Sequence, residues 1–349
     1  MRILTSAAMA VMAVAGLCGI SGAAAPPLPH APVALLAVNM RQPFVQELAE
    51  GFATGVEDIG RTAHVQEGPE IGDPGHQVEL LRGYRTAPPS GLAVFTQSPE
   101  LLAAPLAETT AAGVPVLAVA CAPAVGSGVR LFVGNDNYRL GRLLAGQVAA
   151  RLPRDTSGVI VLGANVPGMP TIDKRVNGVR DELRERFPNA RVLGPFDTKM
   201  DPTANREAWE VLLAANPDAV AFLGTGEADG RNLAALRQER HATWVAGSFG
   251  VDMPLLLAVR SGDLSLVSPE HFLQGAIAGR LQALQARVGV ALPRGWIEVP
   301  GLVVDRGNVD AVIDRQTWLF SRQNWFRPQV DDIVTDPGRH LRPLSDASV

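Results

Sequence analysis

Two short segments contain residue types that could perform chemistry. Residues 224–229 read Gly-Thr-Gly-Glu-Ala-Asp and begin like the glycine-rich loop that binds a dinucleotide, but they lack the third small residue of that loop. Residues 246–250 read Ala-Gly-Ser-Phe-Gly and approach the turn that carries a nucleophilic serine, but alanine replaces the first glycine and no evident histidine partner follows in order. Neither segment supports nucleotide binding or hydrolysis, so we predict a protein that is not an enzyme and has no catalytic residue.

Histidine and cysteine are the other side chains that could bind a metal or react. Cys121 would be the single thiol left after removal of an export signal, and one thiol cannot form an internal disulfide. It could be a reactive thiol at the edge of a ligand cleft or, as the more ordinary alternative, a small buried residue. The histidines show no metal-ligand spacing, so we expect neither a metal nor a cofactor. They are His30, His64, His76, His241, His271 and His340.

The composition indicates a globular chain with room for two domains. The chain has 349 residues, of which 47% are hydrophobic, and it contains 35 glycines and 27 prolines. Its formal net charge is −4, and neither a basic patch nor a leading helix-turn-helix points to nucleic acid. We therefore expect no nucleic-acid partner.

The N-terminus has the pattern of an export signal. Arg2 precedes an apolar run over residues 3–20, and the small residues 21–25 form a candidate cleavage region. A membrane anchor is the alternative, but the run is short and ends without a charged stop. Cys18 could be a lipidation site, although Leu17 before it is larger than the residue such sites usually need. We predict that residues 1–25 are a signal peptide.

Strand-like and helix-like segments alternate along the first part of the chain. Residues 33–38 form an unbroken apolar run that is typical of a strand buried on both faces, and Pro43 begins a helical pattern. Further strands are expected at residues 91–95 and 114–120, with a helix between them that ends at Gly113. Units of this kind with short loops predict parallel strands joined by right-handed crossovers, and hence a doubly wound α/β lobe.

A second lobe of the same kind is expected to begin after residues 131–152. This segment reads as a strand, a polar turn at residues 134–137 and an amphipathic helix, after which the alternation restarts with a strand at residues 159–163. The chain is expected to return near Ser268 and to cross again at residues 296–304. Three crossings would form a hinge, and a ligand would bind between the lobes, beyond the carboxyl ends of the strands.

These crossings give the predicted domain organisation. The first lobe contains residues 26–133 and 268–299, and the second contains residues 134–267 and 300–314. Residues 315–349 form a C-terminal extension that either docks across a lobe or forms a partner site. Its aromatic residues are Trp318, Phe320, Trp325 and Phe326.

Eight ordered segments between residues 31 and 314 carry a resemblance to a known family. They are Gln42-Pro43-Phe44, residues 113–119, residues 133–142, Arg175 with Gly178, and residues 195–197, 212–220, 269–279 and 301–310. Together and in this order they resemble periplasmic sugar-binding proteins of the ribose and simple-sugar type. The resemblance implies the type I periplasmic binding protein fold, in which two doubly wound parallel-sheet lobes are joined by a three-strand hinge.

The resemblance also implies a function. The chain is expected to be a monomer in the periplasm that captures a small, sugar-derived ligand and delivers it to the inner-membrane permease of an ABC importer. Two alternatives stay open. One is a sensor subunit that reports its ligand to a receptor or histidine kinase, and the other is a periplasmic carrier or enzyme for a less polar or acidic metabolite.

The same resemblance implies a set of ligand-binding residues. Phe44 would stack on an apolar face of the ligand, Phe196 would supply a second aromatic wall, and Arg175 would present its planar donors to ligand oxygens. Gln42 replaces the usual asparagine beside the first aromatic and can also donate and accept. The expected set is completed by Asn39, Cys121 and Glu270.

The assignments of Arg175, Phe44 and Phe196 have ordinary structural alternatives. Arg175 could be an exposed helix charge paired with Asp173 or Asp181, and the two phenylalanines could be core residues.

Several positions that are aromatic (Val45) or polar (the others) in the family hold apolar or small residues in this chain. They are Val45, Ala120, Cys121, Gly224, Phe249 and Pro269. An unmatched polar atom buried on closure costs about 1–3 kcal/mol, so a ribose-like sugar bound in the ordinary way is not expected. Arg175, if it lies in the cleft, needs an acceptor such as a carboxylate, a phosphate or clustered oxygens. We hypothesise a ligand with one polar end and a sizeable apolar body.

Overall fold

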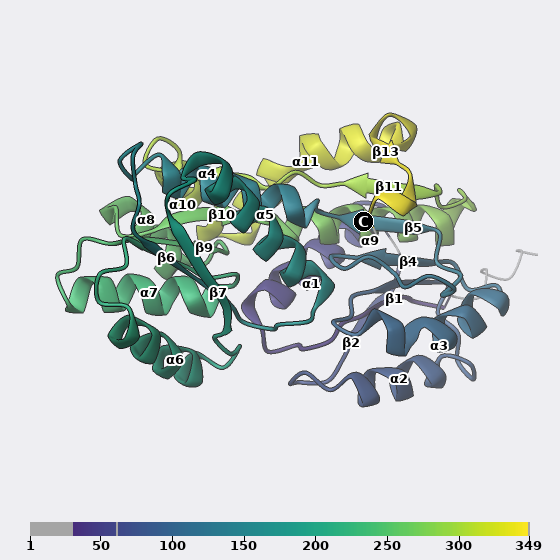
Figure 1. Cartoon of the computed structure of the whole chain (residues 1–349). Helices are drawn as coiled ribbons and strands as arrows, with labels where there is room; N and C mark the ends of the chain where they lie inside the picture. Colours follow the sequence, from purple (N-terminus) through teal and green to yellow (C-terminus); the bar gives the residue numbers. More distant parts are fainter. Residues whose placement is uncertain (1–30, 61, 348–349) are drawn as a thin grey trace, which may run out of the picture.

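The computed structural model describes residues 31–60 and 62–347 and shows two α/β lobes side by side (Figure 1). The strand order is β13-β11-β5-β4-β3-β1-β2 in the first sheet and β12-β10-β9-β8-β6-β7 in the second. Neighbouring strands are parallel except in the pairs β11/β13 and β10/β12. This arrangement confirms the predicted fold class. The predicted signal peptide and Cys18 lie outside the described residues.

The two sheets divide the strands between the lobes. The first sheet contains β1 (Val33–Leu36), β2 (His64–Glu67), β3 (Gly91–Val94), β4 (Val116–Val119), β5 (Leu131–Gly134), β11 (Gly295–Glu298) and β13 (Leu341–Arg342). The second sheet contains β6 (Val159–Ala164), β7 (Arg191–Asp197), β8 (Ala221–Leu223), β9 (Val245–Phe249), β10 (Ser265–Ser268) and β12 (Leu302–Val304).

Helices cover both faces of each sheet (Figure 1). Those of the first lobe are α1 (Pro43–Glu57), α2 (Pro74–Gly83), α3 (Pro99–Ala111), α9 (His271–Val288) and α11 (Leu319–Thr335). Those of the second lobe are α4 (Asn137–Ala149), α5 (Pro170–Arg186), α6 (Pro202–Ala215), α7 (Glu227–Glu239), α8 (Met253–Ser261) and α10 (Val309–Thr317). Within the described part of the chain, no helix combines the length and the apolar character that crossing a bilayer would need.

The local sequence explains where these elements begin and why the strands are apolar. All four residues of β1 are fully buried, because helices cover both faces of its sheet. Proline occupies the first turn of several helices, where its missing N–H costs no hydrogen bond. The carboxylates of Asp136 and Asp252 accept backbone N–H bonds at the starts of α4 and α8. Strand ends and helix starts therefore meet at one edge of each sheet.

One pair of helices in each lobe packs with almost no side chain between the backbones. At the contact of α1 with α9, a Cβ atom added to Gly51 would lie 2.1 Å from the Phe272 carbonyl oxygen. At the contact of α4 with α5, a Cβ atom added to Gly178 would lie 2.0 Å from the Tyr138 carbonyl oxygen. Glycine is therefore required at these positions by close backbone approach, and both lobes use the same device.

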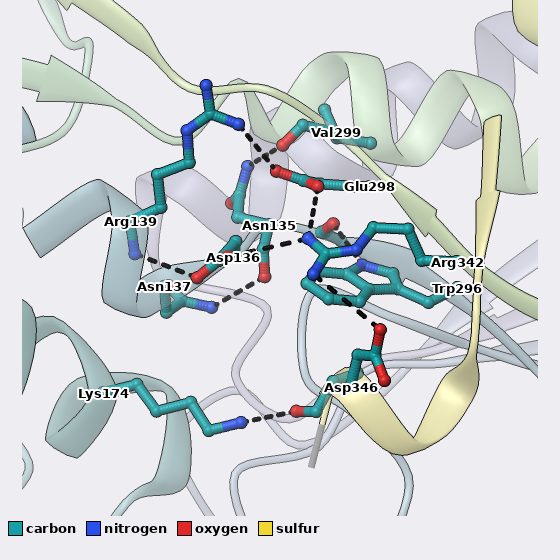
Figure 2. A network of polar contacts seen from close by, with 12 residues as sticks. Asn135, Asp136, Asn137, Arg139, Lys174, Trp296, Glu298, Val299, Arg342 and Asp346 are labelled. Atoms are coloured by element: carbon teal, nitrogen blue, oxygen red, sulfur yellow. Dashed lines mark hydrogen bonds and ion pairs between the residues drawn. The ribbon is translucent and has the colours of Figure 1, made fainter. Parts of the chain in front are cut away.

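The three predicted crossings between the lobes are present and are joined by one side chain. The Asn135 amide donates to the carbonyl oxygens of Pro269, at 3.0 Å, and Val299, at 2.7 Å. Its own carbonyl oxygen accepts from Gln274 at 2.8 Å. Figure 2 shows Asn135 pointing toward Val299 beside the polar groups that surround the hinge. Because Asn135, Pro269 and Val299 lie on different crossings, this buried amide fixes the spacing of the hinge strands.

The Asn135→Ala variant is expected to unfold with a free energy lower than that of the wild type by about 3 kcal/mol, because buried hydrogen-bonding groups lose their partner. Urea denaturation measures this difference. The matched control is Asn216→Ala, whose amide makes a single local bond to the Leu212 carbonyl oxygen and should cost less than about 1 kcal/mol. Equal losses for the two variants would contradict the role given to Asn135.

The C-terminal extension is docked on the first lobe. Phe326 on α11 is buried and stacks on Phe272 of α9 with ring centroids 5.4 Å apart. Strand β13 pairs with β11, and Arg342 stacks over Trp296 and forms an ion pair with Glu298 at 2.6 Å (Figure 2). Further along, the Lys174 ammonium donates to the Ala347 carbonyl oxygen, which ties this end of the chain to the second lobe. The extension thus spans the hinge region.

Candidate functional site

A cavity of about 70 Å³ lies between the lobes. Its wall is formed largely by segments that follow strands of both sheets, where loops and helix starts from the two lobes face each other. The lining residues are Gln42, Phe44, Phe95, Gln97, Ala120, Asn165, Val166, Met169, Thr171, Ile172, Arg175, Met200, Thr225, Gly226, Glu227, Ala228, Phe249, Gly250, Pro269 and His271. The sequence therefore predicted the location of the cavity correctly.

Arg175 is the most deeply buried charged side chain of this wall. It is 8% exposed, its Nε donates to the Asn137 side-chain oxygen at 2.8 Å, and its Nη1 donates to the Thr225 carbonyl oxygen at 3.1 Å. Its guanidinium also lies 4.7 Å from the centre of the Phe249 ring. Burial lowers the pKa of Arg175 to about 10, against the opposing effect of Glu227, and the group stays charged at neutral pH.

The alternative interpretation of Arg175 as an exposed helix charge is wrong. Asp181, one of its suggested partners, instead accepts a hydrogen bond from the Tyr138 hydroxyl at 3.1 Å. Asp173, the other, accepts from the Gly168 backbone N–H at 3.1 Å. The close contact of α4 with α5 explains the burial, because it brings Arg175 against the start of α4.

Aromatic rings from the first lobe form another part of the cavity wall. Phe44 meets Phe95 edge to face, with ring centroids 5.9 Å apart, and lies 5.1 Å from the His271 ring. Burial, reinforced by the positive charge of Arg175, lowers the pKa of His271 to about 3. His271 is therefore neutral at physiological pH and adds a ring and a hydrogen-bonding group, but no charge.

Amide side chains supply most of the remaining polar surface. The Asn165 side-chain oxygen accepts from the Thr225 hydroxyl at 3.0 Å, which leaves its NH₂ group available. Gln42 and Gln97 belong to the first lobe and line the same cavity from its other side. Sequence reasoning missed Gln97 and Asn165. The signal that could have found them is a polar residue placed just beyond a buried strand.

Glu227, which sequence reasoning also missed as a site residue, lines both this cavity and a crevice of about 210 Å³ between the lobes. Burial, with the nearby negative charge of Asp252 adding to it, raises the pKa of Glu227 to about 8. Glu47 of the first lobe lines the same crevice and accepts a hydrogen bond from Gln316 at 3.0 Å. Burial raises the pKa of Glu47 to about 7. Both carboxyl groups are thus protonated more readily in the folded protein than in water.

The Glu47→Gln variant is expected to flatten the pH dependence of stability. Because the pKa of Glu47 is about 7 in the folded protein and near 4.5 when exposed, the folded state binds more protons between these values. Its contribution to stability is complete below about pH 4.5 and is lost as the pH rises to about 7, a change of about 3 kcal/mol.

Thermal unfolding between about pH 5 and pH 8 measures this effect. The control is Glu50→Gln, which changes an exposed carboxylate on the same helix. If the stability of Glu47→Gln depended on pH in the same way as that of the wild type, the raised pKa assigned to Glu47 would be wrong.

The structure brings three of the seven predicted ligand-binding residues, Gln42, Phe44 and Arg175, together around the cavity. It places the other four outside the cavity lining. Phe196 is 37% exposed on β7, the outermost strand of its sheet, and does not line the cavity. Asn39 is buried, and its side-chain oxygen accepts from the Arg41 backbone N–H at 3.3 Å.

Cys121 and Glu270 are the other two residues outside the cavity lining. Cys121 lines a separate pocket of about 40 Å³ beside Lys174, and burial raises the pKa of its thiol to about 11. It therefore fits the more ordinary alternative of a small buried residue. Glu270 is buried in a two-bond pair with Arg315, at 2.7 and 3.2 Å, so its oxygens are already occupied. In residues 31–60 and 62–347, no three histidine, cysteine, aspartate or glutamate side chains cluster as a metal site would require.

Comparison with known proteins gives one family match and many similar folds. A family model described as a periplasmic binding protein domain matches residues 33–287, which is most of the chain. No curated protein shows a significant match.

Three solved structures illustrate the similarity of fold. The periplasmic ribose ABC transporter protein of Conexibacter woesei superimposes with a TM-score of 0.71 at 23% identity, over 84% of this chain and 97% of that chain. A solute-binding protein of Burkholderia graminis in complex with D-arabinose gives 0.73 at 18% identity, over 80% and 96%. One from Agrobacterium vitis bound with α-D-tagatopyranose gives 0.73 at 20% identity, over 81% and 97%.

Proposed function

The chain belongs to the periplasmic binding protein family, and on this premise we propose that it captures a small, sugar-derived ligand between its lobes for delivery to an ABC importer. The observation that carries the proposal is the cavity between the two lobes, in which Arg175 and Phe44 line one space. An aromatic ring can stack on the apolar face of a sugar, and guanidinium and amide groups can bind its oxygens. The protein is proposed to act as a monomer in the periplasm, with a permease as its partner.

Neighbouring structures support transport rather than sensing. Several of the similar solved structures are described as ABC transporter proteins or their solute-binding proteins, some of them in complex with sugars. The sensor alternative has no comparable support. Enzyme function is not proposed, because the family consists of binding proteins and neither of the two chemistry-like segments of the sequence completes its motif.

Thermal unfolding in the presence of a sugar panel tests ligand capture. The panel contains pentoses, hexoses and their acids. A ligand present at about 100 times its dissociation constant should stabilise the protein by about 2.7 kcal/mol, which raises the melting temperature by several degrees. Phe44→Ala should reduce the rise, and Phe320→Ala, which removes an exposed ring outside the cavity, should not. No rise with any sugar or sugar acid would contradict the proposal.

Uptake by cells tests delivery. A strain that lacks this chain should accumulate less of the labelled ligand than the parent strain, and the wild-type chain should restore uptake. Normal uptake combined with a lost transcriptional response to the ligand would favour the sensor alternative.

A further inference from the structure

Arg175 has hydrogen-bond donors that the protein does not use. Its Nε and Nη1 each donate one bond, to Asn137 and Thr225, and both acceptors are uncharged oxygens. A guanidinium has further N–H groups in a planar fork, and this fork matches the two oxygens of a carboxylate. Within the described residues, no carboxylate lies within 4.0 Å of Arg175 to form an ion pair. The cavity therefore contains a buried cation whose counter-ion the protein does not supply.

The other ionisable groups of the cavity wall do not neutralise this charge. Glu227 lies 3.8 Å from Arg231, a second cation that also pairs with Asp252. Because the pKa of Glu227 is raised to about 8, most Glu227 side chains are protonated at neutral pH. His271 is neutral. A ligand that enters the cavity thus meets a net positive charge at Arg175.

The rest of the wall is suited to a ligand body with an apolar face and several hydroxyl groups. Phe44, Phe95 and Ile172 present apolar surface, and Gln42, Gln97 and Asn165 present amides. Amides can donate to and accept from hydroxyl groups without adding charge. Among the lining residues, Arg175 is therefore the main charged group at neutral pH.

From these observations we infer that the ligand is a sugar acid, a monosaccharide with a carboxylate that binds the free N–H groups of Arg175 while its ring lies against Phe44. This inference rests on the proposed function and names the substrate class of the same cavity. A carboxylate is favoured over a phosphate because a phosphate monoester carries close to two charges at neutral pH, whereas the cavity provides one uncompensated cation. Protonated Glu227 can also donate a hydrogen bond to a ligand oxygen.

Calorimetric titration of the mature protein with matched compounds tests the inference. The probes are D-galacturonate and D-glucuronate, their uncharged amides, the parent hexoses and the corresponding hexose phosphates. At least one uronate is expected to bind at least about 30-fold more tightly than its own amide, because the amide keeps the shape of the acid but not its charge. This comparison needs no variant and is independent of any folding defect.

Two variants locate the charge that is recognised. Arg175→Gln should remove the preference for the acid over its amide. Arg184→Gln, which removes an exposed arginine from the same helix, should retain it. Retention of the preference in Arg175→Gln would overturn the assignment to Arg175.

The remaining outcomes separate this inference from the proposed function. If neutral hexoses or amides bind as tightly as the acids, the inference is overturned and the proposed function stands. If hexose phosphates bind more tightly than the acids, the choice of a carboxylate is overturned. If no sugar of any kind binds, the proposed function fails and the inference fails with it.

Discussion

The Arg175→Gln variant is expected to bind the physiological ligand at least about 30-fold more weakly than the wild type, because it removes a buried charge and a planar set of donors. Glutamine retains a polar group of intermediate length and can replace the bond to Asn137 or Thr225, so the fold should persist. Titration calorimetry measures the loss, and the melting temperature without ligand shows whether the variant is folded.

Two further variants show which property of Arg175 causes the loss of ligand affinity. Arg175→Lys keeps the charge but not the fork, and its affinity should lie between those of the wild type and Arg175→Gln. Arg184→Gln should bind like the wild type, because Arg184 is exposed and does not line the cavity. An affinity of Arg175→Gln equal to that of the wild type would show that this side chain is structural.

The Gly178→Ala variant is expected to lower the free energy of unfolding by about 3 kcal/mol. A Cβ atom at this position would lie 2.0 Å from the Tyr138 carbonyl oxygen, and the clash is with backbone, which cannot rotate away. Helices α4 and α5 would have to separate. At the same contact, Gly141 faces the backbone of Arg175, so separation would also displace the guanidinium from the cavity. Both stability and ligand affinity should fall.

Gly146→Ala is the matched control for this prediction. Gly146 lies on α4, and the nearest atom to an added Cβ there would be 3.7 Å away, at the end of the Arg186 side chain. Since alanine is a better helix residue than glycine, this variant should be as stable as the wild type or more stable by up to about 1 kcal/mol. Chemical denaturation compares the two. A Gly178→Ala variant as stable as the wild type would contradict the close packing of α4 on α5.

The sequence was sufficient to predict the two lobes because their signals are local and strong. Unbroken apolar runs such as residues 33–38 belong to strands covered on both faces. Pro43 lies in the first turn of α1, as is typical of a helix start. The polar turn before α4 marked the first crossing. The role of Asn135 within that turn was not predictable, because its partners Pro269 and Val299 lie far away in the sequence.

The cavity was predicted less completely, and the reasons are physical. Arg175 and Phe44 lie on helices that begin at the carboxyl ends of strands, so strand order determines their place. Phe196 lies on an edge strand, and the order of strands in a sheet is not visible in a single sequence. The carboxylate of Glu270 is occupied by its hydrogen bonds with Arg315, which belongs to a helix beyond the predicted hinge. Long-range pairing of this kind decides which polar groups are free to bind a ligand.

A crystal structure of the protein with the ligand that binds most tightly in the panel would show directly which residues bind the ligand. We expect the ligand to lie between the two lobes, with an oxygen at about 3 Å from the terminal nitrogens of Arg175 and its ring against Phe44. A ligand bound elsewhere on the molecule, or one bound between the lobes without contact to Arg175, would contradict the assignment of this cavity and of Arg175 to ligand binding.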